Sequence, residues 1–352
     1  MISWTGWLLR GVRRHRPRAV VTAVVLLSLA ACTGGAAGGD DGGTEDATLG
    51  VVAATATGGP PERARIDLGL LPLIDVAPVY IAIEDGLFER EGLEIEIIPV
   101  QGGAASIPAM IAGELDIAFG AVPSTLSGSA NGLDLRLIAE QNRASPGFSD
   151  LSALPDAGLE GDLIGLEGKR LALNTFANTA ELTARSVVES AGADYDEIEA
   201  VEVPFPDMIP MLERGEVDAA FLVEPFTTIA RQTLDADSIA DPYQGETEGL
   251  PVGSYSTTGN FAANFPNTVA AFQRAVIAAT DLAREDPQRV VDVLPTYTSL
   301  DEDAAAAVTQ PEYVARINQE QIQRVVDLMV KYGLLVEEVD LGTLIIPTPP
   351  EQ

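Results

Sequence analysis

An internal duplication constrains the fold of this chain more than any other feature of its sequence. Residues 107–125 read IPAMIAGELDIAFGAVPST, and residues 209–227 read IPMLERGEVDAAFLVEPFT. At this constant offset of 102 residues, nine of the 19 aligned positions are identical. Average amino-acid usage would give only about one or two identities. The folded part therefore contains two related halves, and its fold must present the same unit twice.

The segments around the two copies follow the same order of elements. Apolar, strand-like runs lie at 66–70, 93–99 and 115–119 in the first half and at 171–173, 198–203 and 217–222 in the second. Helical stretches at 78–90 and 179–191 separate the first two runs of each half, and short helices ending at Gly113 and Gly215 precede the third. This alternation predicts the α/β class, with a parallel sheet covered by helices in each of two lobes.

The composition excludes several classes of function. The chain has 352 residues and 53 Asp and Glu against 21 Lys and Arg, a formal net charge of −32. So acidic a chain is unsuited to nucleic acid, because neutralising phosphates needs clustered Lys and Arg. One Cys and one His exclude disulfide frameworks, Cys-rich zinc sites and iron–sulfur clusters. We therefore expect no metal, no cofactor and no nucleic-acid partner.

The N-terminal segment is typical of an export signal. Five arginines and no acidic residue occupy residues 1–18, and residues 19–31 are an uncharged stretch too short to span a bilayer as a helix. The segment ends Leu-Ala-Ala-Cys, which resembles a bacterial lipobox, and the only cysteine of the chain, Cys32, stands at the lipidated position. We expect residues 1–31 to be removed and Cys32 to carry a lipid anchor, with the export route left open.

Residues 32–63 are predicted to form a flexible tether. They contain four Gly-Gly pairs and few large apolar residues, so they behave as a coil with a typical span of roughly 30 Å. Beyond the tether we expect lobe 1 at 64–143, with 263–346 returning to it, and lobe 2 at 167–251. The Gly-, Pro- and Ser-rich segment 144–166 and the strand-like segment 252–262 are predicted to be the hinge crossings.

The two lobes predict a ligand cleft between them. Ligands of open parallel sheets bind beyond the carboxyl ends of the strands, where loops lead into helix N-termini. Six loops have this position: 71–78, 101–106, 120–124, 174–179, 204–207 and 223–226. If the lobes face each other, these loops line one cleft that closes on a hinge.

At this point the sequence resembles a known family. The run IDVAPVYIAIEDGLFEREGLEIEIIPVQGGAASIPAMIAGELDIAFGAVPST is similar to the first lobe of solute-binding proteins of ABC importers, in the branch for nitrate, sulfonates, taurine and thiamine pyrimidine precursors. EGKRLALNTFANTAELTARSVVESAG and RGEVDAAFLVEPF are similar to its second lobe. The resemblance covers about residues 64–285. It implies a type II periplasmic-binding-protein fold, with two α/β lobes, a central cleft and a hinge.

The resemblance also implies which residues contact the ligand. Carried over by position, the ligand-binding residues are Asp75, Ala77, Pro78, Gly102, Gly103, Pro123, Ser124, Asn174, Thr175, Asn178, Thr179, Asp207, Glu224 and Phe226. The 174–179 loop departs from the Gly- and Ser-rich version of many sulfonate binders. A buried carboxylate at Glu224 would repel an anion, and favours a cationic or N–H-bearing ligand.

Several of these residues have a second, structural interpretation. Asn178 fits a helix cap, with Glu181 completing a capping box, and Glu224 fits the first turn of a helix. Asp116 and Asp218, in the duplicated turns, are predicted to be structural. Tyr255, Thr257 and Thr258 fit either the cleft or an ordinary strand.

The implied function is that of an extracytoplasmic substrate-binding component of an ABC importer, which captures a small organic solute or oxyanion and delivers it to a permease. We expect a monomer on the outer face of the cell membrane and no enzymatic activity. A pyrimidine synthase of the same fold family depends on a Lys, a His and a Cys-rich iron motif; the mature chain would lack the His and the Cys cluster. A surface ligand sensor and a carboxylate-based hydrolase stay open as alternatives.

Overall fold

The structure is a computed structural model that describes residue 56 and residues 58–336 and 339–349. All of these belong to the compact unit Gly50–Gln352. The predicted signal segment, the lipidated Cys32 and the tether as far as residue 55 lie outside the described residues. Within the described part, no helix combines the length and the apolar character needed to cross a bilayer.

The first sheet has six strands in the order β11-β4-β10-β3-β1-β2. Their bounds are β1 (Arg65–Leu70), β2 (Glu94–Pro99), β3 (Ile117–Ala121), β4 (Leu135–Arg143), β10 (Pro251–Thr258) and β11 (Glu312–Tyr313). Strand β1 runs parallel to β2 and β3, with Leu68 opposite both Ile97 and Ile117. Strand β10 enters between β3 and β4 and runs antiparallel to both.

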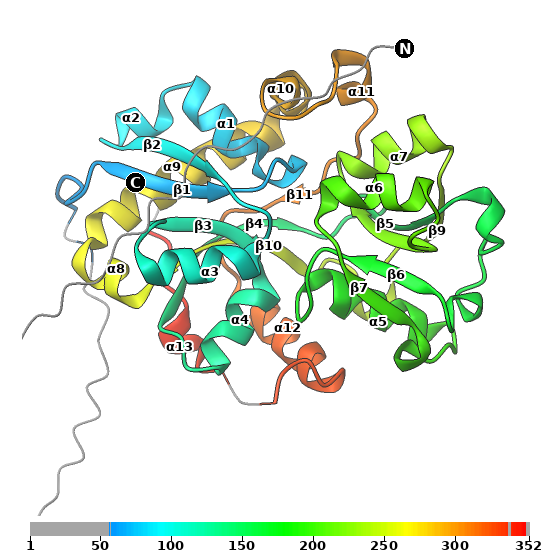
Figure 1. Ribbon diagram of the computed structural model, residues 1–352. Helices are drawn as coiled ribbons and strands as arrows, with labels where there is room; N and C mark the ends of the chain where they lie inside the picture. Colours follow the sequence, from blue (N-terminus) through cyan, green and yellow to red (C-terminus); the bar gives the residue numbers. More distant parts are fainter. Residues whose placement is uncertain (1–55, 57, 337–338, 350–352) are drawn as a thin grey trace, which may run out of the picture. The chain divides into compact units, whose positions relative to one another are not determined.

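Helices cover both faces of the first sheet (Figure 1). Those of this lobe are α1 (Ala77–Glu84), α2 (Leu87–Arg90), α3 (Gly103–Ala112), α4 (Val122–Ala130), α8 (Gly259–Asn264), α9 (Pro266–Glu285), α10 (Gln288–Val293), α11 (Glu302–Ala306), α12 (Gln319–Lys331) and α13 (Leu341–Leu344). Helices α1, α2 and α9 pack together on one face, and α3, α4 and α12 lie on the other. The C-terminal helices α9 and α12 thus pack on elements of the first lobe.

The second sheet has five strands in the order β7-β6-β8-β5-β9. Its elements are β5 (Ser149–Ala153), β6 (Arg170–Leu173), α5 (Thr179–Ser190), β7 (Glu199–Glu202), α6 (Phe205–Glu213), β8 (Ala219–Val223), α7 (Phe226–Leu234) and β9 (Asp237–Ala240). Helices α6 and α7 lie on one face and α5 on the other (Figure 1). Single turns of 3-10 helix occur at η1 (Ile74–Val76), η2 (Pro155–Ala157), η3 (Ile164–Leu166), η4 (Tyr195–Glu197), η5 (Gly245–Thr247) and η6 (Leu294–Thr296).

The two-lobed α/β architecture confirms the prediction, but the sheets are mixed rather than parallel. Strand β5 lies within 144–166 and runs antiparallel to β8, and β10 fills most of 252–262 inside the first sheet. Both segments had been expected to be hinge crossings. Strand β5 could not be predicted from its sequence, because its residues do not alternate between apolar and polar. Ser149 and Asp150 are polar but buried, and Asp150 is paired with Arg231 and Ser238.

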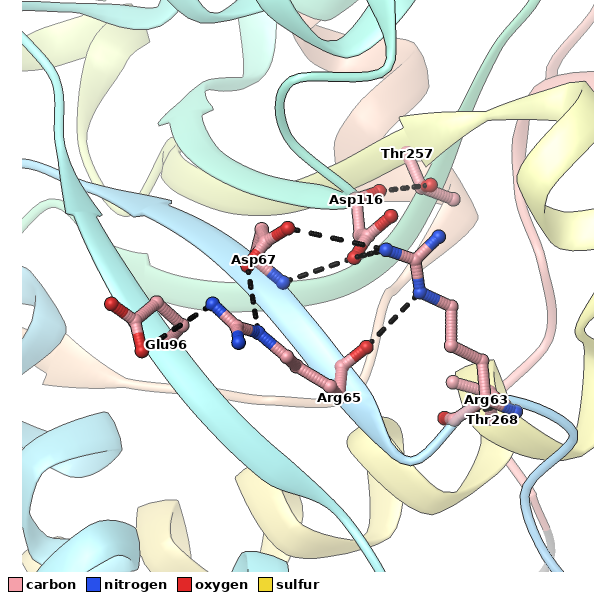
Figure 2. A network of polar contacts seen from close by, with 7 residues as sticks. All are labelled: Arg63, Arg65, Asp67, Glu96, Asp116, Thr257 and Thr268. Atoms are coloured by element: carbon pink, nitrogen blue, oxygen red, sulfur yellow. Dashed lines mark hydrogen bonds and ion pairs between the residues drawn. The ribbon is translucent and has the colours of Figure 1, made fainter.

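The duplicated aspartates are structural, as predicted, and Figure 2 shows the first of them, Asp116. Asp116 precedes β3, and its Oδ2 accepts a hydrogen bond from the backbone N–H of Asp67 in β1 at 3.0 Å. The backbone N–H of Asp116 donates in return to the carbonyl of Asp67 at 2.9 Å. Arg63 balances this carboxylate at 3.0 Å. The aspartate therefore joins the starts of two neighbouring strands.

Asp218 makes the same pair of hydrogen bonds between two strands of the second lobe. Its Oδ2 accepts from the backbone N–H of Arg170 in β6 at 2.8 Å, and its own N–H donates to the Arg170 carbonyl at 2.9 Å. The helices before the two turns also end alike, because Gly113 and Gly215 both adopt the left-handed conformation that glycine tolerates. The sequence repeat therefore corresponds to a repeated structure, in which a helix ends at a glycine and an aspartate then joins two neighbouring strands.

The apolar core continues from one sheet to the other. One cluster of buried side chains includes Leu68 of β1, Phe119 of β3 and Phe221 of β8. In the first lobe, Phe272 of α9 packs between Phe88 and Tyr255, with ring centroids 5.7 and 5.3 Å apart. Each fully buried side chain of this kind contributes roughly 1.5–3 kcal/mol. The lobes are therefore in contact through buried apolar groups on either side of the crossing.

The folded part begins earlier than residue 64. The carboxylate of Glu62 accepts from the backbone N–H groups of Asn267 and Thr268 at 3.1 and 2.9 Å and so satisfies the N-terminus of α9. Partial burial tends to raise the pKa of Glu62, but hydrogen bonds to its carboxylate outweigh this and lower the pKa. The last residues of the predicted tether are therefore attached to the first lobe.

We expect Glu62→Ala to lower the free energy of unfolding by about 1 kcal/mol, the usual cost of a lost helix cap. Because the folded-state pKa of Glu62 is lowered, its contribution is present above the unfolded pKa and is lost as the pH falls through the folded pKa. Urea unfolding at pH 7 and at pH 3 measures this. Glu62→Gln, which keeps one acceptor, should lose less, and equal losses for both variants at both pH values would contradict the capping role.

Candidate functional site

A cavity with an empty volume of about 500 Å³, open solvent included, lies between the two sheets. The first lobe contributes Leu71, Leu73, Asp75, Phe119, Gly120, Ala121, Ser124, Val252 and Gly253. The second lobe and the crossing contribute Asn174, Thr175, Asn178, Thr179, Ala180, Phe205, Phe221, Val223 and Tyr243. Most of these stand at the carboxyl ends of strands or in the turns that follow, which is where α/β sheets bind ligands.

Five of the six predicted loops contribute to this cavity. The exception is 101–106, where Gly102 caps α3 and the Ser106 hydroxyl donates to the Gly102 carbonyl at 3.0 Å. Ser106 lines a smaller neighbouring cavity together with Phe119 and Ser124. Loops from both lobes therefore line the same cavity, and the 101–106 loop lies next to it.

Six of the predicted ligand-binding residues line the cavity: Asp75, Ser124, Asn174, Thr175, Asn178 and Thr179. Seven do not: Ala77, Pro78, Gly102, Pro123, Asp207, Glu224 and Phe226; the eighth, Gly103, is the first residue of α3. Ala77, Pro78 and Pro123 are buried in the first turns of α1 and α4. Asp207 is exposed in the first turn of α6, and Phe226 stacks on Phe205, which does line the cavity, with ring centroids 5.8 Å apart.

Glu224 is fully buried and is occupied by other parts of the protein. Its Oε1 accepts from the Thr228 hydroxyl at 2.9 Å and from the backbone N–H of Thr309 at 3.2 Å. Its Oε2 accepts from the backbone N–H of Thr228 at 3.2 Å, so the carboxylate also closes the first turn of α7. Burial raises the pKa of Glu224. Both carboxylate oxygens are thus used inside the protein, away from the cavity.

Asp75 is the carboxyl group that faces the cavity. It lies on η1, is 3% exposed, and its Oδ1 accepts from Asn142 Nδ2 at 3.0 Å. Its Oδ2 is buried without a hydrogen-bond partner. Burial raises the pKa of Asp75 to about 7, and the hydrogen bond from Asn142 acts in the opposite direction. An unpartnered buried carboxylate oxygen is costly, so this atom is suited to a ligand donor.

The turn that carries Asp75 is held from the C-terminal part of the chain. The hydroxyl of Tyr297 donates to the carbonyl of Leu73 at 3.0 Å, and that of Tyr313 donates to the carbonyl of Ile74 at 2.8 Å. The N–H of Ile74 donates to the carbonyl of Glu224 at 3.3 Å. Hydrogen bonds from both lobes therefore fix the backbone of the two residues before Asp75.

The facing wall of the second lobe is the start of α5. Asn178 is the helix cap, because its Oδ1 accepts from the N–H of Glu181 at 3.1 Å. Its Nδ2 donates to Asn174 Oδ1 at 2.8 Å, and Glu181 in turn accepts from the N–H of Ala177 at 2.5 Å. Asn178 therefore caps α5 and also lines the cavity, so the structure is compatible with both interpretations of this residue.

The aromatic walls of the cavity were not predicted. Phe119 lies in the middle of β3, Phe221 lies in the middle of β8, Phe205 begins α6, and Tyr243 lies in the crossing that leads to β10. The duplication contained a signal for two of them, because Phe119 is one of the nine identical positions and aligns with Phe221. Both phenylalanines occupy the middle position of a five-residue strand in the interior of a sheet.

The return strand contributes little to the site. Tyr255 is buried against Phe272, the Thr257 hydroxyl donates to the carbonyl of Asp116 at 2.6 Å, and the Thr258 side chain caps α8. All three are ordinary strand residues. Val252 and Gly253 of the same strand line the cavity instead.

The cavity is lined mainly by apolar, aromatic and small polar side chains. Among the described residues that line it, Asp75 is the one ionisable carboxyl, and none is Lys, Arg or His. The described part of the chain also gathers no group of three or more His, Cys, Asp or Glu that could hold a metal ion. Aromatic walls with a few convergent polar groups are typical of small-molecule sites.

Two α/β lobes with a cavity between them define the periplasmic-binding-protein fold. The alkanesulfonate-binding protein of Xanthomonas axonopodis, bound to MOPS, has a TM-score of 0.71 at 18% identity, covering 81% of this chain and 99% of that one. The nitrate-binding protein of Synechocystis also has a TM-score of 0.71, at 14% identity, covering 82% and 87%. At these identities the likeness concerns the fold.

The family follows from the sequence comparison. Residues 74–290 match the model of the family described as NMT1/THI5 like, and the chain belongs to this family. It is 22% identical over 221 residues to the formylaminopyrimidine-binding protein of Halalkalibacterium halodurans, covering 62% of this chain and 65% of that protein. It is 24% identical over 234 residues to a 4-amino-5-hydroxymethyl-2-methylpyrimidine phosphate synthase of Aspergillus parasiticus, covering 62% and 67%. The chain thus spans about two thirds of the length of these relatives.

Proposed function

We propose that this chain is the extracytoplasmic solute-binding component of an ABC importer. It captures a small organic solute between its lobes and delivers it to a permease, tethered to the membrane through a lipid on Cys32. The observation that carries this proposal is the cavity between the lobes, lined by the carboxyl-end loops of both sheets. The binding-protein relatives and fold neighbours support it.

Because the cavity lies between two lobes, we expect the lobes to close on the ligand when it binds. Hydrogen bonds such as that from the Thr179 hydroxyl to the Val252 carbonyl, 3.4 Å long, join opposite sides of the cavity. A ligand that touches both walls stabilises the closed arrangement through its own contacts. We expect binding with a Kd around micromolar, roughly −8 kcal/mol.

Calorimetry against a broad panel of small solutes, combined with small-angle scattering, tests the proposal. We expect heat with at least one class of solute and a decrease in the radius of gyration on binding. A matched variant, Asn174→Ala, removes a polar side chain from the cavity and should weaken the binding without changing the radius of the free protein. No heat and no compaction with any solute would contradict the proposal.

A surface sensor that passes its bound state to a receptor is the second candidate. The same cavity would serve both functions, so the partner distinguishes them. Permease and ATPase genes beside this gene would favour transport, and a neighbouring kinase gene would favour sensing.

We also propose that the chain is not an enzyme, although one relative is named a synthase. A two-carboxylate hydrolase needs a pair of carboxyl groups about the scissile bond. Asp75 lines the cavity, whereas Asp207 is exposed and Glu224 is bonded elsewhere. Turnover of a bound ligand that disappears in Asp75→Asn would contradict this proposal.

A further inference from the structure

The charge inside the cavity constrains the ligand. Asp75 is 3% exposed, and one of its oxygens has no hydrogen-bond partner. Among the described residues that line the cavity there is no cationic side chain to balance this carboxylate. A buried carboxylate without a counter-charge is unstable unless it is protonated or an opposite charge is brought to it.

Other buried carboxylates among the described residues have either a counter-charge or several hydrogen-bond donors, which makes Asp75 an exception. Glu140 is paired with Arg143 at 2.6 Å, and Asp150 is paired with Arg231. Glu224 accepts three hydrogen bonds, two of them from backbone N–H groups. Asp75 has one side-chain donor, Asn142, which bonds Oδ1 and leaves Oδ2 unpartnered. The residue with the unpartnered carboxylate oxygen is therefore one that lines the binding cavity.

We propose that the ligand is a small organic cation, with a protonated nitrogen that pairs with Asp75 Oδ2 and an apolar or aromatic body. The inference rests on the proposed solute-binding function, since it concerns the same cavity. The body packs among Phe119, Phe205 and Phe221, whose ring faces also attract a cation. A sulfonate or nitrate is excluded, because its negative charge would face an unpaired carboxylate.

Asn142 is the positioning residue of this arrangement. It is fully buried at the end of β4, and its amide N–H holds Oδ1 of Asp75. Since the two carboxylate oxygens are rigidly linked, the hydrogen bond to Oδ1 also fixes the position of Oδ2. The ligand therefore finds a preset acceptor rather than a rotating carboxylate.

The start of α5, on the opposite wall, does not make the cavity an anion site. The N-terminus of a helix carries a partial positive charge, which would favour an anion. The first turn of α5 already contains the carboxylate of Glu181, which accepts from the backbone N–H of Ala177. Asn178 accepts from the N–H of Glu181 itself. These two groups offset the positive end, so this wall is suited to a neutral acceptor on the body of the cation.

The test is calorimetry of the full chain with matched aromatic probes that differ in charge. The cations are benzamidinium and benzylammonium, the neutral analogues are benzamide and benzyl alcohol, and the anions are benzoate and benzenesulfonate. We expect at least one cation to bind at least tenfold more tightly than its neutral analogue and the anions not to bind. Anions binding more tightly than cations, or no cation binding at all, would overturn the inference.

Two variants locate the effect. Asp75→Asn, which has nearly the same shape, should lower the cation affinity at least tenfold and reduce its advantage over the neutral analogue. Glu224→Gln changes an equally buried carboxylate outside the cavity and should keep the preference of the wild type. A cation affinity that is unchanged in Asp75→Asn would overturn the inference; thermal unfolding checks that both variants are folded.

The inference and the proposed function fail in different ways. If the protein binds an anion or a neutral solute with compaction, it is a solute-binding protein whose ligand is not a cation. If it binds none of the probes and nothing in the broad panel, both proposals are wrong.

Discussion

Asp75→Asn is expected to stabilise the ligand-free protein at pH 8 by up to about 4 kcal/mol. Burial raises the folded-state pKa of Asp75 to about 7, against an unfolded value of 3.8. This difference of about three pKa units corresponds to about 4 kcal/mol, at 1.36 kcal/mol per unit. The cost arises because the free protein at pH 8 must keep a carboxylate buried without a counter-charge.

The stabilisation by Asp75→Asn is expected to depend on pH. Because the folded-state pKa is raised, the contribution of Asp75 to stability is fully present below pH 3.8 and is lost as the pH rises through about 7. The advantage of Asp75→Asn should therefore be small near pH 4, grow towards pH 7 and stay constant above it. Urea unfolding of both proteins at pH 4, 6 and 8 measures the difference.

Glu140→Gln is the matched control with the opposite expected sign. Glu140 is fully buried like Asp75, but Arg143 pairs with it at 2.6 Å. Burial raises the pKa of Glu140 too, but removing this carboxylate leaves the buried end of Arg143 without its partner, and this loss destabilises the protein. If Asp75→Asn also lowered the stability at pH 8, the carboxylate of Asp75 would have a partner in the free protein, and its role as an open ligand acceptor would be wrong.

Gly253→Ala is the second substitution with a large expected effect. A Cβ at Gly253 would lie 2.5 Å from Asn142 Oδ1 and 2.6 Å from Cε2 of the Phe119 ring. Both neighbours are buried, so one of them must move, at a cost of about 1–3 kcal/mol for an overpacked core. Since Asn142 positions Asp75 and Phe119 lines the cavity, we expect ligand affinity to fall along with the unfolding temperature.

Gly259→Ala is the control for Gly253→Ala. A Cβ at Gly259 would lie even closer to a neighbour, 2.2 Å from Asp134 Oδ2. The Asp134 side chain is 55% exposed, however, and can turn towards solvent. We expect a small loss of stability and unchanged ligand affinity. Equal effects of the two substitutions on binding would show that the contact of Gly253 with Asn142 is unimportant for the site.

The duplication made the architecture predictable. It is a repeated physical unit, in which Asp116 and Asp218 bracket neighbouring strands and Gly113 and Gly215 end the preceding helices. These features depend on residues that are close together in the sequence. The two lobes and most of their strands and helices could therefore be predicted. The family could be recognised for the same reason, and the family match confirms it.

The strands at the crossings could not be predicted by the same rules. Glu140, Gln141 and Asn142 of β4 are all fully buried, although their sequence is that of an exposed loop. Their burial depends on partners far away in the chain, such as Gly253 of β10, which lies opposite Asn142. Tertiary contacts therefore override local polarity in this region.

The candidate site was predicted in part, for a related reason. Loop position at the carboxyl ends of strands located Asp75 and the 174–179 loop correctly relative to the cavity. It did not tell which side chains turn inwards. Glu224 and Asp75 both follow strands, but Glu224 is bonded by Thr228 and Thr309, and Asp75 has one oxygen unpartnered. Such a difference exists only after the C-terminal segment has folded onto both lobes.

The two tyrosines that hold the turn of Asp75 also determine when the binding site becomes complete. Tyr297 and Tyr313 lie 224 and 239 residues after the carbonyls that they bond. A ribosome releases the Asp75 turn long before it has made either tyrosine. The second sheet and most of the first can form from residues made earlier, but the turn that carries Asp75 is fixed only after the C-terminal segment has been made.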